Sequence, residues 1–213
     1  MSRPHAPYHH GDLRRGLVEG GLRLVEEIGV ESMTLQKLAK HCGVSAPALY
    51  HHFRSKDDLL QELGTRSLAL FEEALAEALG TPDTGLSLPD FAVAYVTFAL
   101  RHPELYELMF GRVTWIRATP PTPSTAPLHA RARQSFRAFG ERMAEEQRRG
   151  RIPRSEDPLR LSQVVWATLH GLCRMHNDGL AFSKETITDI ALHAAKLLQP
   201  LFDKPRRKPK VIA

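Results

Sequence analysis

The sequence is poor in cysteine and has no long apolar stretch. Its 213 residues include only two cysteines, Cys42 and Cys173, so we expect no disulfide framework and a reducing cytoplasm as the setting. No apolar run approaches the roughly 20 residues that a membrane-spanning helix needs, and we expect no membrane contact. The first twelve residues are polar and contain three histidines, which predicts no secretory signal.

Motifs typical of enzymes are also missing. The chain contains no GxSxG, P-loop, HExxH or dinucleotide-binding pattern. We therefore predict that it is not an enzyme, has no catalytic residues and uses no cofactor. His170, Cys173 and His176 lie at positions i, i+3 and i+6 of one predicted helix, so they do not easily converge on a metal ion, and we predict no metal site.

The basic charge of the chain is confined to one end. The formal net charge is +5, yet residues 204–213 hold five Lys/Arg and no Asp/Glu, and the other residues are neutral overall. The charge alone is therefore weak support for nucleic-acid binding. The basic tail either contacts DNA phosphates without sequence preference or is a disordered, solubilising end.

Strand-like alternation is almost absent, whereas apolar residues recur at helical spacing along the chain. The pattern predicts an all-α fold of about nine helices with no sheet. The expected helices run from about Leu13 to Ile28 and over residues 34–41, 46–52, 56–79, 88–101, 103–111, 128–149, 158–177 and 184–202. The proline-rich segment 119–127 predicts a loop.

A shift in composition near residue 55 indicates two parts. Short helices with tight turns precede it, and longer amphipathic helices follow. We predict an N-terminal domain over residues 1–55, a C-terminal domain over 56–203 and a basic tail over 204–213. The long helix over 56–79 would bridge the two domains.

The segment around residues 34–53 has the pattern of a helix–turn–helix. Thr34 is a good N-cap for the first helix, and Gly43 supplies the positive φ that a sharp reversal needs. Ser45 can cap the second helix, where Pro47 falls in the first turn and its missing N–H costs little. Such a motif places its second helix in the major groove of DNA. Ser55 and Asp58 then form a capping box at the start of the long helix.

The second helix would offer small side chains in its first turn, which allows close approach to base edges. Tyr50, His51 and Lys56 can reach phosphates, while Gln36 and Lys37 either touch DNA or lie on a solvated face. His9 and His10 either lie on the DNA backbone or belong to a frayed terminus. The residues predicted to contact DNA are Thr34, Gln36, Lys37, Ser45, Ala46, Pro47, Ala48, Tyr50, His51 and Lys56.

The stretch MTLQKLAKHCGVSAPALYHHFRSKDDLL, residues 33–60, resembles the DNA-binding region of the tetracycline-repressor-type (TetR) family of bacterial transcription regulators. The resemblance covers residues 8–63 well and is weaker beyond. HPELYELMFG (102–111) and WATLHGL (166–172) are similar to a TetR subgroup named for a Trp-His-Gly signature in its C-terminal domain.

This resemblance implies an all-helical homodimer that binds a palindromic operator, with residues 46–52 in the major groove. It also implies that helices 158–177 and 184–202 pair with those of a second copy. A small molecule bound in the C-terminal domain would move the long helix and release DNA. We therefore predict a transcriptional repressor released by a small apolar or amphipathic effector. An effector-independent DNA-binding protein and a helical-bundle enzyme or carrier for hydrophobic molecules remain as alternatives.

The C-terminal part contains many aromatic residues, and each of them is most often simply part of a core. Together they are numerous enough to line an apolar cavity. His170 is either a polar anchor in that cavity or a satisfied core histidine. The predicted effector-binding residues are Phe91, Tyr95, Phe98, Met109, Phe110, Phe136, Phe139, Trp166 and His170.

Overall fold

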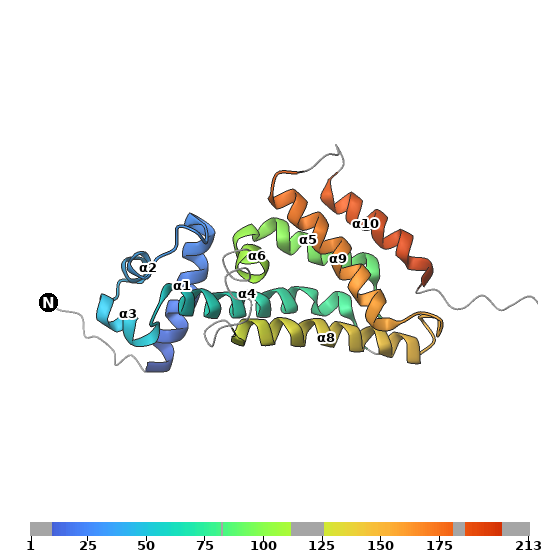
Figure 1. Cartoon of the computed structure of the whole chain (residues 1–213), viewed down its shortest axis with the longest axis horizontal. Helices are drawn as coiled ribbons and strands as arrows, with labels where there is room; N and C mark the ends of the chain where they lie inside the picture. Colours follow the sequence, from blue (N-terminus) through green and yellow to red (C-terminus); the bar gives the residue numbers. More distant parts are fainter. Residues whose placement is uncertain (1–9, 82, 112–125, 181–185, 202–213) are drawn as a thin grey trace, which may run out of the picture. The chain divides into compact units, whose positions relative to one another are not determined.

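The computed structural model describes residues 10–81, 83–111, 126–180 and 186–201, and these form nine α-helices with no strand (Figure 1). The all-α prediction is confirmed. The elements are α1 (His10–Ile28), α2 (Leu35–Cys42), α3 (Ala46–His52), α4 (Lys56–Leu79), α5 (Leu88–Arg101), α6 (Pro103–Phe110), α8 (Ala126–Arg148), α9 (Pro158–Asn177), α10 (Ile187–Leu198) and the 3-10 turn η2 (Gln199–Leu201). No helix among these residues is long and apolar enough to span a membrane.

The observed bounds of α3, α4, α5 and α9 are the predicted ones. The other ends differ by a few residues, mostly because caps lie outside the helices. Thr34, for example, caps α2 and is not part of it. α8 begins at Ala126, inside the predicted loop 119–127, because Pro127 suits a first helical turn. The rest of that loop, and residues 184, 185 and 202 of the last predicted helix, lie outside the described residues.

The chain divides into two compact units. The first unit comprises Met1–Leu70 and His102–Ala132, and the second comprises Phe71–Arg101 and Arg133–Ala213, as far as these ranges are described. This division follows contacts within the chain, and it cuts α4 between Leu70 and Phe71. The predicted boundary at residue 55 follows a change in composition and stays a prediction.

In the first unit, α1 packs against α2 and α6, and α2 packs against α3. Leu17, Leu38, Leu49, Phe53 and Leu63 are completely buried. Each such side chain stabilises the fold by about 1.5–3 kcal/mol relative to an exposed position. The short helices of this unit therefore depend on a shared core, since isolated helices of this length are marginal in water.

Two adjacent glycines allow α1 to approach its neighbours closely. A Cβ atom built on Gly20 would lie 2.5 Å from Cys42 Sγ, and one built on Gly21 would lie 2.8 Å from Leu63 Cδ2. Both separations are shorter than van der Waals contact allows. Gly20 and Gly21 thus leave room for the side chains of Cys42 and Leu63 directly against the backbone of α1.

In the second unit, α5 packs against α9 and α10, which also contact each other (Figure 1). Aromatic rings fill much of its interior. Phe91 of α5 stacks on Phe139 of α8 with ring centroids 4.8 Å apart, and Phe71 meets the edges of Tyr95 and Phe98 at 4.9 and 5.2 Å. These separations suit favourable aromatic contacts.

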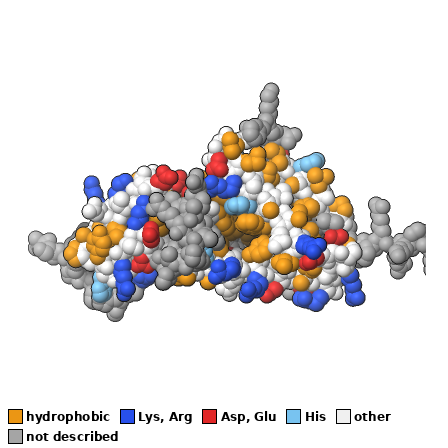
Figure 2. All heavy atoms as spheres, in the orientation of Figure 1, with side chains coloured by type: hydrophobic (Ala, Val, Ile, Leu, Met, Phe, Trp, Pro, Cys, Tyr) orange, Lys and Arg blue, Asp and Glu red, His pale blue; other side chains and the backbone are white. Residues whose placement is uncertain are grey.

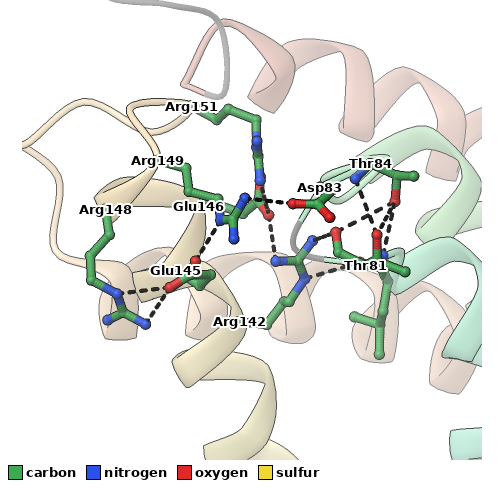
Figure 3. A network of polar contacts seen from close by, with 10 residues as sticks. Thr81, Asp83, Thr84, Arg142, Glu145, Glu146, Arg148, Arg149 and Arg151 are labelled. Atoms are coloured by element: carbon green, nitrogen blue, oxygen red, sulfur yellow. Dashed lines mark hydrogen bonds and ion pairs between the residues drawn. The ribbon is translucent and has the colours of Figure 1, made fainter.

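An ionic cluster joins the end of α8 to the loop between α4 and α5 (Figure 3). Glu146 is 1% exposed and pairs with both Arg142 and Arg151. Arg142 also donates to the carbonyl groups of Leu79 and Thr81 at 3.0 and 2.9 Å. Because a buried carboxylate is costly unless it is paired, the two arginines are what make Glu146 tolerable at this position.

The outer surfaces of α9 and α10 carry large hydrophobic side chains. Figure 2 shows hydrophobic side chains exposed among charged ones over these helices. Leu159, Val164 and Met175 of α9 are 52%, 49% and 41% exposed, and Leu197 of α10 is 68% exposed. A Cβ built on Gly171 would meet no atom within 4 Å, so the surface between Val164 and Met175 on α9 is open.

Candidate nucleic-acid interface

The start of α2 and the turn after it have the geometry that the sequence predicts. Thr34 is extended, and its Oγ1 accepts a hydrogen bond from the N–H of Lys37 at 3.2 Å. Gly43 has φ 67° and ψ 28°, the left-handed conformation that favours glycine. The N–H of Val44 then donates to the carbonyl of Ala39 at 3.0 Å, which closes the end of α2.

The second helix of the motif, α3, is fixed at both ends. Ser45 Oγ accepts from the N–H of Ala48 at 3.4 Å, and Pro47 lies in the first turn. Leu49 and Phe53 are 0% exposed and anchor the inner side of the helix. The opposite face is thereby turned outward.

The outward face of α3 carries the side chains that the sequence assigns to DNA. Ser45, Ala46, Pro47 and His51 are exposed, and Ala48 is half-buried. The first turn therefore presents no bulky or charged side chain, so it can approach base edges closely. Tyr50 projects from the same helix and is 48% exposed.

A surface hollow lies between α3 and the first turns of α2 and α4. Its volume is about 330 Å³, and it brings together Thr34, Gln36, Tyr50 and Lys56, all of them predicted DNA contacts. Arg54 adds a second cation to its lining. Backbone N–H groups at helix N-termini favour anions, so two such ends beside two cations suit a phosphate group.

Two of the predicted cations already make hydrogen bonds within the protein. Lys56 Nζ donates to the carbonyl of Glu31 at 2.9 Å. Lys37 Nζ donates to the carbonyl of Ser32 at 2.7 Å, and Lys37 does not line the hollow. Each ammonium has three donors, so a hydrogen bond to one carbonyl leaves capacity for a phosphate.

At the start of α4, one of the two hydrogen bonds of the predicted capping box is formed with a different residue. Asp58 N–H donates to Ser55 Oγ at 3.1 Å, as expected. The Asp58 carboxylate, however, accepts from the N–H of Arg54 at 3.1 Å, one residue before the cap. The chain thus enters α4 with the backbone of Arg54 fixed at the rim of the hollow.

Arg14 of α1 is a site residue that the sequence analysis missed. It donates to the carbonyl of His52 at 3.0 Å and pairs with Glu62 of α4 at 2.9 Å. Its guanidinium also lies 5.0 Å from the centre of the Phe53 ring. A cation at the C-terminus of a helix is favourable, so Arg14 helps to hold the end of α3. Its partners are distant in sequence, and no local pattern indicated them.

The predicted effector-binding residues do not all belong to one compact unit. Met109 and Phe110 of α6 fall in the first unit, and the others fall in the second. In the second unit, Phe91, Tyr95, Phe98 and Phe139 are buried core residues. Their role in binding an effector stays a prediction.

Three of these residues form a less buried aromatic group between α8 and α9. Trp166 stacks on His170 with centroids 4.6 Å apart, and Phe136 meets Trp166 at 6.0 Å. Burial lowers the pKa of His170 to about 4, and the charge of Arg174 adds to the shift. The imidazole is therefore neutral at physiological pH. Cys173, considered above as a metal ligand, is buried, whereas His176 is exposed.

Comparison with known families finds two matches, to separate segments of the chain. The model described as "Bacterial regulatory proteins, tetR family" matches residues 17–63. The model described as "Tetracyclin repressor-like, C-terminal domain" matches residues 88–199. Neither description names the Trp-His-Gly subgroup, and that finer assignment stays a prediction.

Among curated proteins, the chain is 45% identical over 53 residues to the tetracycline repressor protein class A from transposon 1721 of Escherichia coli. That match covers 25% of this chain and 24% of the relative. The matches to the first eight curated relatives span 21% to 54% of the relatives' own lengths. Each of these likenesses is therefore a partial one.

Solved structures resemble the chain over nearly its whole length. A protein of unknown function from Rhodococcus sp. RHA1 is 29% identical with a TM-score of 0.71, over 93% of this chain and all of that one. The structure of AibR in complex with isovaleryl coenzyme A and operator DNA is 20% identical with a TM-score of 0.60, over 89% of this chain and 99% of that one. At that identity the second likeness concerns the fold alone.

The second family model alone covers more than half of the chain, and the first covers the helix–turn–helix just described. The chain belongs to the TetR family of bacterial regulatory proteins.

Proposed function

We propose that the protein is a transcriptional repressor that binds duplex DNA through α3 and the hollow beside it. The observation that carries this proposal is the gathering of Tyr50, Lys56 and the N-terminus of α2 around one hollow, next to the small exposed first turn of α3. In this arrangement α3 reads base edges in the major groove while the hollow holds a backbone phosphate. Repression follows when the bound protein occupies a promoter.

The proposed active species is a homodimer formed through α9 and α10. The support is the set of exposed hydrophobic side chains on these helices, which includes Val164, Met175 and Leu197. A second copy would remove these surfaces from water, which is favourable. The two α3 helices of such a dimer must lie about 34–36 Å apart to enter successive major grooves, so the operator is expected to be palindromic.

We further infer that a small apolar or amphipathic effector releases the DNA and that the protein acts in the cytoplasm. The group formed by Phe136, Trp166 and neutral His170 offers an apolar surface with one uncharged polar end. Such an effector shifts the dimer between two conformations, and the size of the shift is limited by the difference in its affinity for the two. No described residue cluster favours the enzyme or carrier alternative, and effector-independent DNA binding remains the second candidate.

A selection experiment tests the proposal. The purified protein is mixed with random duplexes, the retained fragments are sequenced, and their affinity is measured by gel shift at two salt concentrations. We expect an enriched palindrome and an affinity that falls steeply with salt. If no sequence is enriched and no duplex is retained at low salt, the protein is not a DNA-binding repressor. Release by one member of a panel of apolar and amphipathic compounds separates the repressor from the effector-independent candidate.

The dimer is tested by sedimentation. Val164→Glu places a charge in the exposed hydrophobic surface of α9, so it should shift the protein toward the monomer. Gln163→Glu is a matched control, because Gln163 is also exposed on α9 and its replacement adds the same charge. If wild type and Val164→Glu both sediment as dimers, another surface forms the dimer, and a monomeric wild type would refute the homodimer.

A further inference from the structure

Two lysines that are predicted DNA contacts, Lys37 and Lys56, donate hydrogen bonds to the loop between α1 and α2, residues 29–34. Lys56 Nζ donates to the Glu31 carbonyl at 2.9 Å, and Lys37 Nζ donates to the Ser32 carbonyl at 2.7 Å. The last residue of the loop, Thr34, is the cap of α2 and lines the hollow with Lys56. The loop therefore contacts the Lys56 ammonium directly and ends at the residue that caps α2.

The other side of this loop is held by α6. Glu104 Oε2 accepts a hydrogen bond from the N–H of Val30 at 2.8 Å, and Val30 is 1% exposed. Gly29 has φ 79°, and a Cβ built on it would lie 3.5 Å from the same carboxylate oxygen. One residue before α6, His102 Nδ1 lies 2.5 Å from Glu26 Oε1 near the end of α1. α6 thus contacts the end of α1 and the loop through two carboxylate interactions.

These contacts connect two parts of the sequence that the family models match separately. Val30 lies in the segment 17–63, and Glu104 lies in the segment 88–199. Both residues belong to the first compact unit, so their hydrogen bond lies within one packed body. A chain of direct contacts therefore runs from α6 through the loop to Lys56 and the hollow.

We propose that Glu104 is a positioning residue for the DNA-binding surface. By holding Val30, it fixes the loop 29–34, so that Lys56 and the cap of α2 keep the geometry that a phosphate requires. This inference rests on the proposed function, since it assigns a regulatory contact to the same surface. A movement of α6 that breaks the hydrogen bond between Glu104 and Val30 would release the loop and lower the affinity for DNA.

The sign of a mutational effect distinguishes this role from simple electrostatics. Glu104 is an anion, so its removal increases the attraction of the protein to the polyanionic DNA. Electrostatics alone therefore predicts tighter DNA binding for Glu104→Ala. The positioning role predicts weaker binding, because the loop loses its anchor and the phosphate contacts lose their preorganisation.

The test measures gel-shift affinity for a duplex taken from the selection described above. Glu104→Ala should weaken binding about fivefold or more, as expected for the loss of a coupled contact. Glu104→Gln keeps an acceptor oxygen without the charge and should bind at least as well as wild type. Glu104→Asp keeps the charge but draws the carboxylate back, so its affinity should also fall.

A matched control comes from Glu31, whose exposed side chain lies on the same loop. Lys56 bonds the backbone carbonyl of Glu31, so Glu31→Ala removes an equal charge without removing that hydrogen bond. We expect Glu31→Ala to bind DNA as tightly as wild type or more tightly. If Glu104→Ala behaves like Glu31→Ala, the positioning role is wrong.

A double-mutant cycle with Lys56→Met tests the path itself. If Glu104 acts through Lys56, Glu104→Ala should cost much less affinity in the Lys56→Met background than in wild type. If the two substitutions instead weaken DNA binding by factors that simply multiply in the double mutant, the proposal is overturned. Hydrogen exchange of the Val30 amide provides a readout without DNA: it should be slow in wild type and Glu104→Gln and fast in Glu104→Ala and Glu104→Asp. Equal protection of the Val30 amide in wild type and all three variants would also overturn the proposal. Failure of wild type to retain any duplex would instead refute the proposed function.

Discussion

The proposed DNA-binding surface of the first unit and the aromatic interior of the second unit are built by different means. In the first unit, short helices are positioned by caps, by a left-handed glycine and by side chains that bond backbone carbonyls, such as Arg14 and Lys56. In the second unit, longer helices are positioned by rings such as those of Phe91 and Phe139. We therefore expect the first surface to lose affinity for DNA when one hydrogen bond is misplaced, and the second interior to lose stability when side-chain volume is removed.

The largest expected effect is on the stability of the second unit. Phe91→Ala removes a ring that is 4% exposed and stacked on Phe139, so the free energy of unfolding should fall by about 3–4 kcal/mol. Urea unfolding followed by circular dichroism measures this change. Phe91→Leu is the control and should cost clearly less. A small loss for Phe91→Ala would mean that packing in this interior is looser than the ring contacts indicate.

The next effect concerns DNA binding and leaves stability nearly unchanged. Pro47→Glu places an anion on the exposed first turn of α3, where it would face the DNA, so operator affinity should fall about a hundredfold. Pro47→Ala, which adds no charge, should bind much better. Gel shift measures affinity, and the unfolding midpoint checks the fold. Full affinity in a folded Pro47→Glu protein would exclude α3 as the helix that enters the groove.

Smaller losses are expected at the hollow. Tyr50→Ala and Lys56→Ala should each weaken binding about tenfold on any duplex, because phosphate contacts carry no sequence information. Lys56→Ala should also reduce the slope of log affinity against log salt by about 1, while Tyr50→Ala should leave that slope unchanged. A loss restricted to the selected operator would instead make these residues base contacts.

The smallest effect is a pH dependence of stability in the second unit. Burial holds the pKa of His170 at about 4 in the folded chain against 6.5 as its ordinary value, so between these pH values the unfolded chain binds a proton that the folded chain does not. The free energy of unfolding should therefore fall as the pH drops from 6.5 to 4. Because His170 is only half-buried, we expect the free energy of unfolding to fall by about 1 kcal/mol over this range.

Urea unfolding at pH 7 and pH 4 measures this difference. His170→Gln should remove about that part of the pH dependence. His176→Gln is the matched control, since His176 lies on the same helix but is exposed. An unchanged pH dependence in His170→Gln would mean that another group titrates in this range.

The local features of the fold were predictable from the sequence because each depends on residues a few positions apart. Thr34 and Ser45, predicted as helix caps, and Gly43, predicted to have a positive φ, are examples, and the structure confirms all three. The resemblance to TetR regulators rested on the same short segment, and the family match confirms it. The predicted DNA contacts Thr34, Tyr50 and Lys56 lie around one hollow, although their contact with DNA stays a prediction.

Contacts between distant residues were not predictable. Arg14 with His52, Lys56 with Glu31 and Glu104 with Val30 each join different helices or loops. No helical period or cap signal relates such residues, since the contacts exist only once the helices have packed. The assignment of α6 to the first compact unit has the same origin, and it is why the predicted effector-binding residues are divided between the units.

The paired glycines of α1 also limit how this protein can be improved. Glycine is among the weakest helix formers, so an engineer seeking a hardier variant would choose alanine at Gly20 and Gly21 first. Both replacements would push a methyl group against Cys42 Sγ or Leu63 Cδ2. Alanine at either position therefore requires the Cys42 or Leu63 side chain to move aside, and the cost of that movement offsets the gain in helix propensity.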